Sequence, residues 1–479
     1  MIWRDFHEAT KHTPESLRRS AHSLDWAHMP DPFRHYEGAP VLDLPADPPA
    51  PDRAATAPDG PAFLSQLLYY SAAISAAKRV PSTGYKYALR VNPSSGNLHP
   101  TEFHFVTNGL KDWPDGLYHY RASAHMAERR ARGNFAAELN QPGSPVLFLL
   151  TAAAWREEWK YRDRAYRYCL HDLGHAWQSL ALAARAMGCE TLAFGQFADE
   201  RVARVCRLAG DEWPMLLIEL RGPSMPLVAP DAGTTVWSPG EANQLSSETI
   251  EYPLVDRMHA ATSVCLRVAP PAEPMPAGSG TIKLPPPAQS TRSFGEVARR
   301  RRSALDFQGG TLSTSLPQLS AILDAACQPL HADFASARFI QLYLYVHRVG
   351  GLPPGVYRHW PERSELEPVK LGDQRVAAAG LSLGQDLAGN ACVAFSMAAD
   401  LERAGRAFGD RGYRYAYFEA GAIGQRLYLA AEALGLQATG IGAFFDDQVH
   451  RYLDLAPGQG QVVYHFAIGH AVPDPRLEA

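Results

Sequence analysis

"RAYRYCLHDLGHAWQSLALAARAMGCETLAFGQFADERV" at residues 164–202 and "RGYRYAYFEAGAIGQRLYLAAEALGLQATGIGAFFDDQV" at residues 411–449 lie in one chain. The two stretches align without a gap, with each residue of the first matching one 247 positions further on. Sixteen residues are identical in this register; among them, Tyr166, Arg167, Tyr168, Gly174, Gln178, Ala183, Gly188, Gly195, Phe197 and Asp199 recur as Tyr413, Arg414, Tyr415, Gly421, Gln425, Ala430, Gly435, Gly442, Phe444 and Asp446. One register held over this length indicates an internal duplication.

Both copies contain the pattern of a long buried helix. Apolar residues recur at helical spacing and a glycine follows, which is a common helix end. They are Leu180, Ala183, Ala184, Met187 and Gly188 in the first copy, and Leu427, Ala430, Ala431, Leu434 and Gly435 in the second. Core packing explains this pattern better than a cofactor motif does.

Looser similarity upstream extends the repeat. "DGLYHY" at Asp115 matches "PGVYRH" at Pro354, and the apolar strand "SPVLFLLTA" matches "NACVAFSMA". We therefore predict an α+β fold of two tandem domains, each a largely antiparallel sheet flanked by helices. The two copies are expected to face each other about a pseudo-twofold axis as a single-chain pseudo-dimer.

The length of 479 residues suits two domains with extensions. Residues 226–290 are rich in Pro, Gly, Ser and Ala, a composition that favours an extended connection. The predicted organisation is an N-terminal extension at 1–60, domain 1 at 61–225, the linker at 226–290 and domain 2 at 291–479.

Composition limits the classes of partner. A net charge of -4 offers no basic field for nucleic acid or anionic lipid. The six cysteines form no CxxC pair, and no stretch has the length and hydropathy of a membrane helix. We expect a cytoplasmic protein that binds neither nucleic acid nor membrane, and further homo-oligomerisation stays open.

Two short segments occur in one copy only. The first half inserts "PSSGN" (Pro93, Ser94, Ser95, Gly96 and Asn97) before a strand. Its hydroxyl, amide and backbone groups could form a neutral cradle for a polyol or heterocycle, although turn propensity alone also explains it.

The second half has a run of four arginines before Ser303, and the first half lacks it. Guanidinium groups beside a hydroxyl bind phosphate well, although a solvated charged face is an equally good explanation from composition. Together the two segments predict one phosphorylated, polyol-bearing ligand held between the halves.

These residues resemble the FMN-dependent nitroreductase-like flavoproteins, and within them the SagB/ThcOx-type azoline dehydrogenases. The resemblance rests on Arg301-Arg302-Ser303, on Pro93 to Asn97, and on Gly440-Ile441-Gly442-Ala443 before Phe444. "EEWKYRDRAYRY" adds Lys160 and Tyr161, which resemble the catalytic Lys-Tyr pair of that branch; the second half lacks this pair.

The resemblance implies one non-covalent FMN per chain, in a composite site built from both halves, with the mirror site degenerate. The implied cofactor-binding residues are Arg90, Pro93, Ser94, Ser95, Gly96, Asn97, Arg301, Arg302, Ser303, Gly440, Ile441, Gly442, Ala443 and Arg476. Lys160 and Tyr161 are the implied acid/base residues, since a desolvated lysine can release its proton and a tyrosine can relay one. A surface lysine and a packing tyrosine are the alternative.

The resemblance further implies a dehydrogenase acting on a peptide-derived or other natural-product intermediate. An NAD(P)H-dependent nitro or quinone reductase and a non-catalytic scaffold subunit are the alternatives. A zinc hydrolase is a weaker one: His171 and His175 lie one helical turn apart with Asp172 between them, but no third ligand is evident, and no metal site is predicted.

Overall fold

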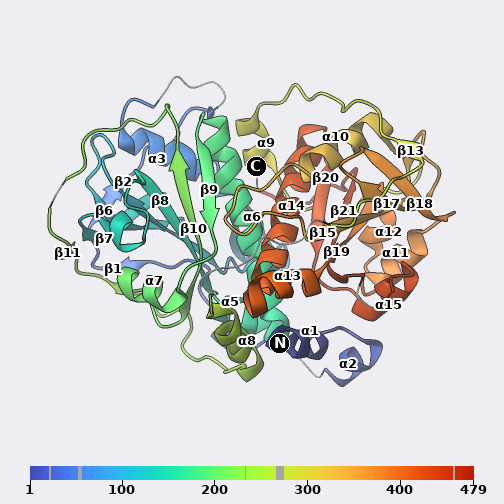
Figure 1. Ribbon diagram of the computed structural model, residues 1–479, viewed down its shortest axis with the longest axis horizontal. Coiled ribbons are helices and arrows are strands. Elements are labelled where there is room, and N and C mark those ends of the chain that lie inside the picture. Colours follow the sequence, from blue (N-terminus) through green and yellow to red (C-terminus); the bar gives the residue numbers. More distant parts are fainter. Residues whose placement is uncertain (21–22, 52–56, 232, 266–274, 457–458, 479) are drawn as a thin grey trace.

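The computed structural model describes residues 1–20, 23–51, 57–231, 233–265, 275–456 and 459–478. Two halves lie side by side, each an antiparallel sheet with helices packed on it (Figure 1). The first sheet has the order β11-β7-β6-β5-β8-β10-β9, with β2 also on β7, and the second has β13-β18-β17-β15-β19-β21-β20. The predicted α+β fold of two tandem domains is confirmed.

The strands of the first sheet are β2 (Val41–Asp43), β5 (Thr101–Thr107), β6 (Gly116–Arg121), β7 (Met126–Arg132), β8 (Val146–Ala153), β9 (Glu190–Phe194), β10 (Glu212–Arg221) and β11 (Val236–Trp237). Those of the second are β13 (Ile282–Lys283), β15 (Ile340–Val346), β17 (Gly355–Trp360), β18 (Glu365–Leu371), β19 (Val393–Ala399), β20 (Gln437–Ile441) and β21 (Gln461–Gly469). Three two-stranded sheets pair β1 (Tyr36–Glu37) with β12 (Glu241–Ala242), β3 (Ile74–Arg79) with β4 (Lys86–Arg90), and β14 (Thr314–Ser315) with β16 (Val349–Gly350).

The α-helices up to the middle of the chain are α1 (Ile2–Ala9), α2 (Pro14–Arg19), α3 (Gly60–Tyr69), α4 (Phe135–Glu138), α5 (Trp155–Tyr161), α6 (Ala165–Ala186), α7 (Asp199–Cys206) and α8 (Pro253–Ser263). The later ones are α9 (Phe294–Arg300), α10 (Leu316–Ala326), α11 (Arg375–Leu381), α12 (Asp386–Asn390), α13 (Leu401–Phe408), α14 (Gly412–Ala433) and α15 (Asp446–Tyr452).

The central strands β8 and β19 are buried along their whole length. Their sequences, "VLFLLTAA" and "VAFSMAA", are nearly continuous apolar runs rather than alternating ones. Such runs occur where both faces of a sheet are covered. This explains why the two strands were recognisable as a repeated pair in the sequence.

The two long helices α6 and α14 cross at the centre of the molecule (Figure 1), and we call the interface between the halves the seam. They meet at Gly174 and Gly421, which are counterparts in the repeat. A Cβ atom on Gly174 would lie 2.3 Å from the carbonyl oxygen of Phe418, and one on Gly421 would lie 2.2 Å from that of His171. Both glycines are therefore needed for the close approach of the helices.

Buried ion pairs cross the seam twice in the same way. Nη1 of Arg167 lies 2.9 Å from Oδ1 of Asp446. Nη1 of Arg414 lies 2.6 Å from Oδ2 of Asp199. All four residues are among the identical ones, so these repeated residues join the two halves rather than stabilising each half separately.

The structural repeat also includes segments outside the two sheets. "FHEAT" in α1 reappears as "MHAAT" in α8, within the segment 226–290 that was expected to be extended. The hydroxyl of Thr10 accepts a 2.9 Å hydrogen bond from Nε of Arg167, and that of Thr262 accepts one of 2.9 Å from Nε of Arg414. Helices α1 and α8 thus make equivalent contacts at the seam.

Candidate active site

The loop between β4 and β5, residues 93–97, is called the serine loop. Gly96 and Asn97 have φ values of 58° and 61°, and His99, just beyond the loop, has 51°. Non-glycine residues adopt such left-handed backbone at a cost and only where the surroundings impose it, which is often at functional sites. Glycine and asparagine adopt this backbone readily in turns, so the residue held at a cost here is His99.

Asp172 on α6 anchors the serine loop. Its carboxylate accepts hydrogen bonds from Oγ of Ser94 at 2.7 Å, from Oγ of Ser95 at 2.8 Å and from the backbone N–H of Ser95 at 2.9 Å. Both hydroxyl protons are therefore directed at Asp172. The two hydroxyl groups would therefore offer lone pairs, rather than protons, to a ligand over this loop, and backbone groups lie beside them.

Lys160 and Tyr161, at the end of α5, lie against the serine loop. A Cβ atom on Gly96 would be 2.9 Å from Nζ of Lys160 and 2.9 Å from the hydroxyl of Tyr161, so a larger residue there would displace the ends of these two side chains. The ring of Tyr161 lies 4.1 Å from that of Tyr168, centre to centre. Burial holds the pKa of Tyr161 well above its usual range, so this hydroxyl keeps its proton at neutral pH.

The second half reaches the backbone that leads into the serine loop through Arg301. Its Nε donates to the carbonyl oxygen of Val91 at 3.0 Å and its Nη2 to that of Arg90 at 3.2 Å. Its Nη1 is buried and has no hydrogen-bond partner among the described residues. The arginine run and the serine loop, which are far apart in the sequence, thus meet at the seam.

Ser303 is connected through Tyr428 to residues 440–443, which we call the glycine segment. The hydroxyl of Ser303 lies 2.8 Å from that of Tyr428, which accepts a 2.9 Å hydrogen bond from the N–H of Gly440. A Cβ atom on Gly440 would lie 2.0 Å from the hydroxyl of Tyr464. This segment therefore passes directly against the aromatic side chains of the seam.

The rest of the glycine segment faces the first half. A Cβ atom on Gly442 would lie 2.1 Å from the ring of Tyr168, and the carbonyl oxygen of Gly442 accepts a hydrogen bond from Arg164 at 3.2 Å. The side chain of Ile441 is buried, and the carbonyl oxygen of Ala443 accepts a hydrogen bond from another loop of its own half. The structure thus brings Gly440 and Gly442 to the seam.

A cavity of about 560 Å³ opens beside Arg302 and Ser303, a volume that suits a small-molecule ligand. Its lining includes Lys78 from strand β3 of the first half and Asp474 near the C-terminus. Nζ of Lys78 lies 2.8 Å from Asp474, and Nε of Arg476 lies 3.0 Å from it. Sequence reasoning missed Lys78, because the contact with the C-terminal segment that brings it to the cavity leaves no signal near Lys78 in the sequence.

The side chains of three predicted residues are held mainly by other protein atoms. Arg90 donates to the carbonyl oxygen of Pro32 in the N-terminal segment and covers the ring of Phe33, so only its backbone faces the seam. The amide nitrogen of Asn97 donates to a backbone carbonyl of strand β4. The guanidinium of Arg302 donates to backbone carbonyls and to Ser75, but its Nε is buried without a partner among the described residues.

The histidines of α6 have aromatic and amide neighbours. His171 stacks on Tyr464 at 4.2 Å, and His175 lies 3.1 Å from the Tyr464 hydroxyl and 3.3 Å from Oε1 of Gln425. Within the described ranges, no three His, Cys, Asp or Glu side chains gather in a way that could hold a metal ion. The zinc alternative thus has no ligand set in this part of the chain.

Aromatic side chains pack against Gly195 in the region that corresponds to this site across the pseudo-twofold axis. The ring of Phe334 stacks on that of Tyr415 at 4.2 Å and 7°. A Cβ atom on Gly195, the counterpart of Gly442, would lie 2.6 Å from both rings. Asp333 accepts a hydrogen bond from the N–H of Gly195 at 2.8 Å and so fixes the segment that carries Phe334.

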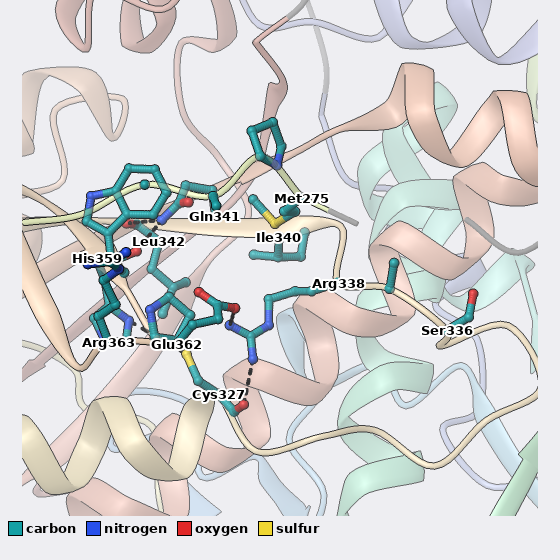
Figure 2. A pocket seen from close by; sticks show the side chains of 16 residues that line it. Met275, Cys327, Ser336, Arg338, Ile340, Gln341, Leu342, His359, Glu362 and Arg363 are labelled. Atoms are coloured by element: carbon teal, nitrogen blue, oxygen red, sulfur yellow. Dashed lines mark hydrogen bonds and ion pairs between the residues drawn. The ribbon is translucent and has the colours of Figure 1, made fainter. Parts of the chain in front are cut away.

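A second cavity, of about 270 Å³, lies in the second half and is lined in part by β15 and β17 (Figure 2). Sγ of Cys327 lies 3.7 Å from Nδ1 of His359 there, and Arg338 donates to the carbonyl oxygen of Cys327. Burial raises the pKa of Cys327 to about 11, so the thiol stays protonated and is a poor nucleophile. None of the predicted site residues lines this cavity.

Known proteins resemble the chain in sequence and in structure. A Methanocaldococcus jannaschii protein named "Putative nitroreductase MJ1384" is 33% identical over 169 residues, which are 33% of this chain and 83% of the relative. The "Trifolitoxin-processing protein TfxB" of Rhizobium leguminosarum bv. trifolii is 29% identical over 139 residues, which are 26% of this chain but only 37% of that protein. A crystal structure titled "putative nitroreductase from anabaena variabilis" superposes with a TM-score of 0.80 at 26% identity and covers 98% of this chain and 99% of its own.

No helix within the described ranges is long and apolar enough to cross a membrane. The family model described as "Nitroreductase family" matches residues 71–220 and 299–470, one match in each half. These matches cover both central helices and the two sheets except for the edge strands β2, β11 and β13, and together they span more than half of the chain. The chain therefore belongs to the nitroreductase family.

Proposed function

We propose that this protein binds one FMN across the seam and acts as a dehydrogenase on a peptide-derived or other natural-product intermediate. Family membership implies an oxidoreductase; the single FMN, the residues that hold it and the direction of the reaction are our proposal. The observation that carries it is the contact of Arg301 from the second half with the backbone that leads into the serine loop of the first. Two segments, each present in one copy only, thus meet at one place.

The residues around the cavity suit a phosphate monoester. Lys78, Arg302 and Arg476 supply three positive charges, and Asp474 supplies one negative charge. The surplus of two positive charges matches the charge of roughly -1.5 to -2 on a phosphate group at neutral pH. The buried donor of Arg302 that has no partner among the described residues would gain one from such an anion.

FMN, when bound, would supply the hydride acceptor of the reaction. The chain would then orient the substrate and manage one proton. Lys160 and Tyr161 touch the serine loop, which is the proposed flavin contact, and they are absent from the second copy. Tyr161 keeps its proton at neutral pH and can donate a hydrogen bond, so we assign proton acceptance to the amine of Lys160.

One FMN per chain follows from the filled mirror region. Phe334 occupies the space beside Gly195, and Tyr415 is held there by a 2.9 Å hydrogen bond to the carbonyl oxygen of Gly195. The mirror region also lacks both the arginine run and the serine loop. A second flavin would have to displace a packed aromatic side chain and would find no phosphate ligands.

The substrate class rests on similarity. One relative is named as a processing protein, and the Lys-Tyr pair resembles that of azoline dehydrogenases. An NAD(P)H-dependent nitro or quinone reductase is the second candidate, since two of the named similar proteins carry the word nitroreductase in their names. A scaffold subunit without flavin is the third.

Anaerobic flavin reduction separates these candidates. The full chain is loaded with FMN, its stoichiometry is measured from flavin absorbance, and bleaching is followed with NADPH or with a peptide that contains a thiazoline. We expect about one FMN per chain and faster bleaching by the peptide. Faster bleaching by NADPH would favour the reductase, a stoichiometry near two would contradict the filled mirror region, and a chain that binds no FMN would favour the scaffold.

A further inference from the structure

Helix α5 carries an acid that the duplicated fold does not require. The side chain of Glu157 is fully buried, and no N–H or hydroxyl donor of the described residues reaches either carboxyl oxygen. In the register that pairs Tyr161 with Phe408, the counterpart of Glu157 is Ala404 on α13, which is also buried. The second half therefore folds with a methyl group at this position.

The carboxyl group of Asp172 lies near that of Glu157 and interacts with it, and the helices that carry the two acids, α5 and α6, pack against each other. Asp172 has an acidic counterpart, Glu419, whose carboxylate accepts the N–H groups of Phe339 at 2.8 Å and Ile340 at 3.1 Å. Both acids thus anchor the chain segment that leads into a central strand. That anchoring belongs to the fold, whereas the second acid beside it occurs in the first half only.

Two neighbouring buried carboxyl groups do not readily ionise together, because their negative charges repel each other and water solvates neither of them. Burial raises the pKa of Asp172 to about 7, although hydrogen bonds from the serine loop lower it. Burial and the neighbouring Asp172 hold the pKa of Glu157 well above its usual range. The other titratable groups that act on the pair are Arg156, Lys160 and Tyr161 of α5, Tyr168 and Cys169 of α6, and Tyr464 of β21.

The pair therefore keeps at least one proton near neutral pH, and that proton lies between two elements of the site. Glu157 is one helical turn before Lys160 on α5, whereas Asp172 holds the serine loop through Ser94 and Ser95. An O–H bond of one acid directed at the other would connect α5 to the loop.

We infer that Glu157 is a positioning residue of the active site, which shares one proton with Asp172 and so keeps Lys160 and Tyr161 against the serine loop. The inference rests on the proposed function for the role of these two residues. When base takes the shared proton, one O–H bond breaks, its electron pair stays on the carboxylate oxygen, and two carboxylates then face each other. Their repulsion pushes α5 away from the loop.

The affinity for FMN, measured by quenching of flavin fluorescence between about pH 6 and about pH 9, tests this inference. For the wild type we expect binding to weaken about tenfold across this range as the pair loses its proton. Glu157→Gln keeps an N–H donor toward Asp172 at every pH, so its affinity should stay within about twofold of a constant value. Glu157→Ala, the residue of the second half, should bind weakly at every pH.

If the affinity for FMN had the same pH dependence in the wild type and in Glu157→Gln, the inference would be overturned. Titration of the FMN phosphate and of other side chains affects both proteins equally, so only a difference between them reports on Glu157. Infrared spectra of the cofactor-free protein provide a second readout. We expect the absorption of a protonated buried carboxyl at neutral pH in the wild type and its loss in Glu157→Gln; unchanged spectra would also overturn the inference. If no variant binds FMN, the proposed function fails, and the infrared result still decides whether the pair holds a proton.

Discussion

Replacing Gly174 with alanine should force the two central helices apart at their crossing. The new Cβ atom would lie 2.3 Å from the carbonyl oxygen of Phe418, 2.9 Å from Cα of Gly421 and 3.0 Å from the backbone nitrogen of Ala422. All three are backbone atoms of α14, so no side-chain rotation can relieve the contact. The helices must move apart by an appreciable fraction of an ångström, which weakens packing along the whole seam.

Overpacking a well-filled core costs about 1–3 kcal/mol, and rigid backbone contacts place this site near the upper end. Alanine regains about 1 kcal/mol through its higher helix propensity. We therefore expect Gly174→Ala to lower the free energy of unfolding by about 1–2 kcal/mol. Gly421→Ala should have the same effect, because its Cβ would lie 2.2 Å from the carbonyl oxygen of His171.

Gly380→Ala on α11 is the matched control, since no atom outside its own helix lies within 4 Å of that Cβ position. It should gain up to about 1 kcal/mol from helix propensity alone. Urea unfolding followed by tryptophan fluorescence and by circular dichroism measures all three variants, and an FMN titration shows whether the seam still forms the site. A Gly174→Ala protein as stable as the wild type, with Gly380→Ala stabilised as expected, would refute the close crossing.

Four further predictions follow from the site and the seam. Lys160→Ala should leave FMN stoichiometry unchanged and reduce turnover by about 100-fold or more, because it removes the proton acceptor; unchanged turnover would contradict this assignment. Phe334→Ala should lower the unfolding free energy by about 3 kcal/mol without raising FMN stoichiometry above one, and two bound FMN would show that the mirror site is intact. Arg162 has φ 52° and ψ -133°, and its counterpart in the second half is Gly409. Arg162→Gly should raise the melting temperature, because it relieves about 1 kcal/mol or more of backbone strain. A lower melting temperature would argue against strain at this position. Burial opposes ionisation of Asp446, but the charges of Arg164 and Arg167 hold its pKa well below the usual range. Its ion pairs therefore stabilise the fold above about pH 4, and this stability is lost as the pH falls further. Asp446→Asn should reduce the loss of unfolding free energy at acid pH, and an unchanged loss would contradict this prediction.

Much of the site could be predicted because the second copy acts as an internal control. The serine loop and the arginine run each occur once, and the structure brings them together through Arg301. The same comparison separates Lys160 and Tyr161 from residues that the fold needs in both halves. Comparison of aligned positions requires no knowledge of three-dimensional contacts, so the sequence alone is enough for it.

Other features of the site could not be predicted from local patterns. Lys78 enters the cavity because the C-terminal segment packs on the hairpin β3–β4, and nothing near Lys78 in the sequence indicates that contact. The direction of Arg90 toward Pro32 depends on the path of the N-terminal segment. The repeat of α1 in α8 is too short, as "FHEAT" and "MHAAT", to stand out without the matching contacts of Thr10 and Thr262.

The sequence by itself determined the duplication, the long buried helix in each copy and the apolar central strands, because periodicity and repetition are properties of neighbouring residues. Only the tertiary structure decided that Asp199 pairs with Arg414 and Asp446 with Arg167, so that each copy completes the other. Identical residues could equally have paired within each half. The choice depends on how two whole domains dock, which is set by the summed packing of α6 against α14 and not by any local pattern.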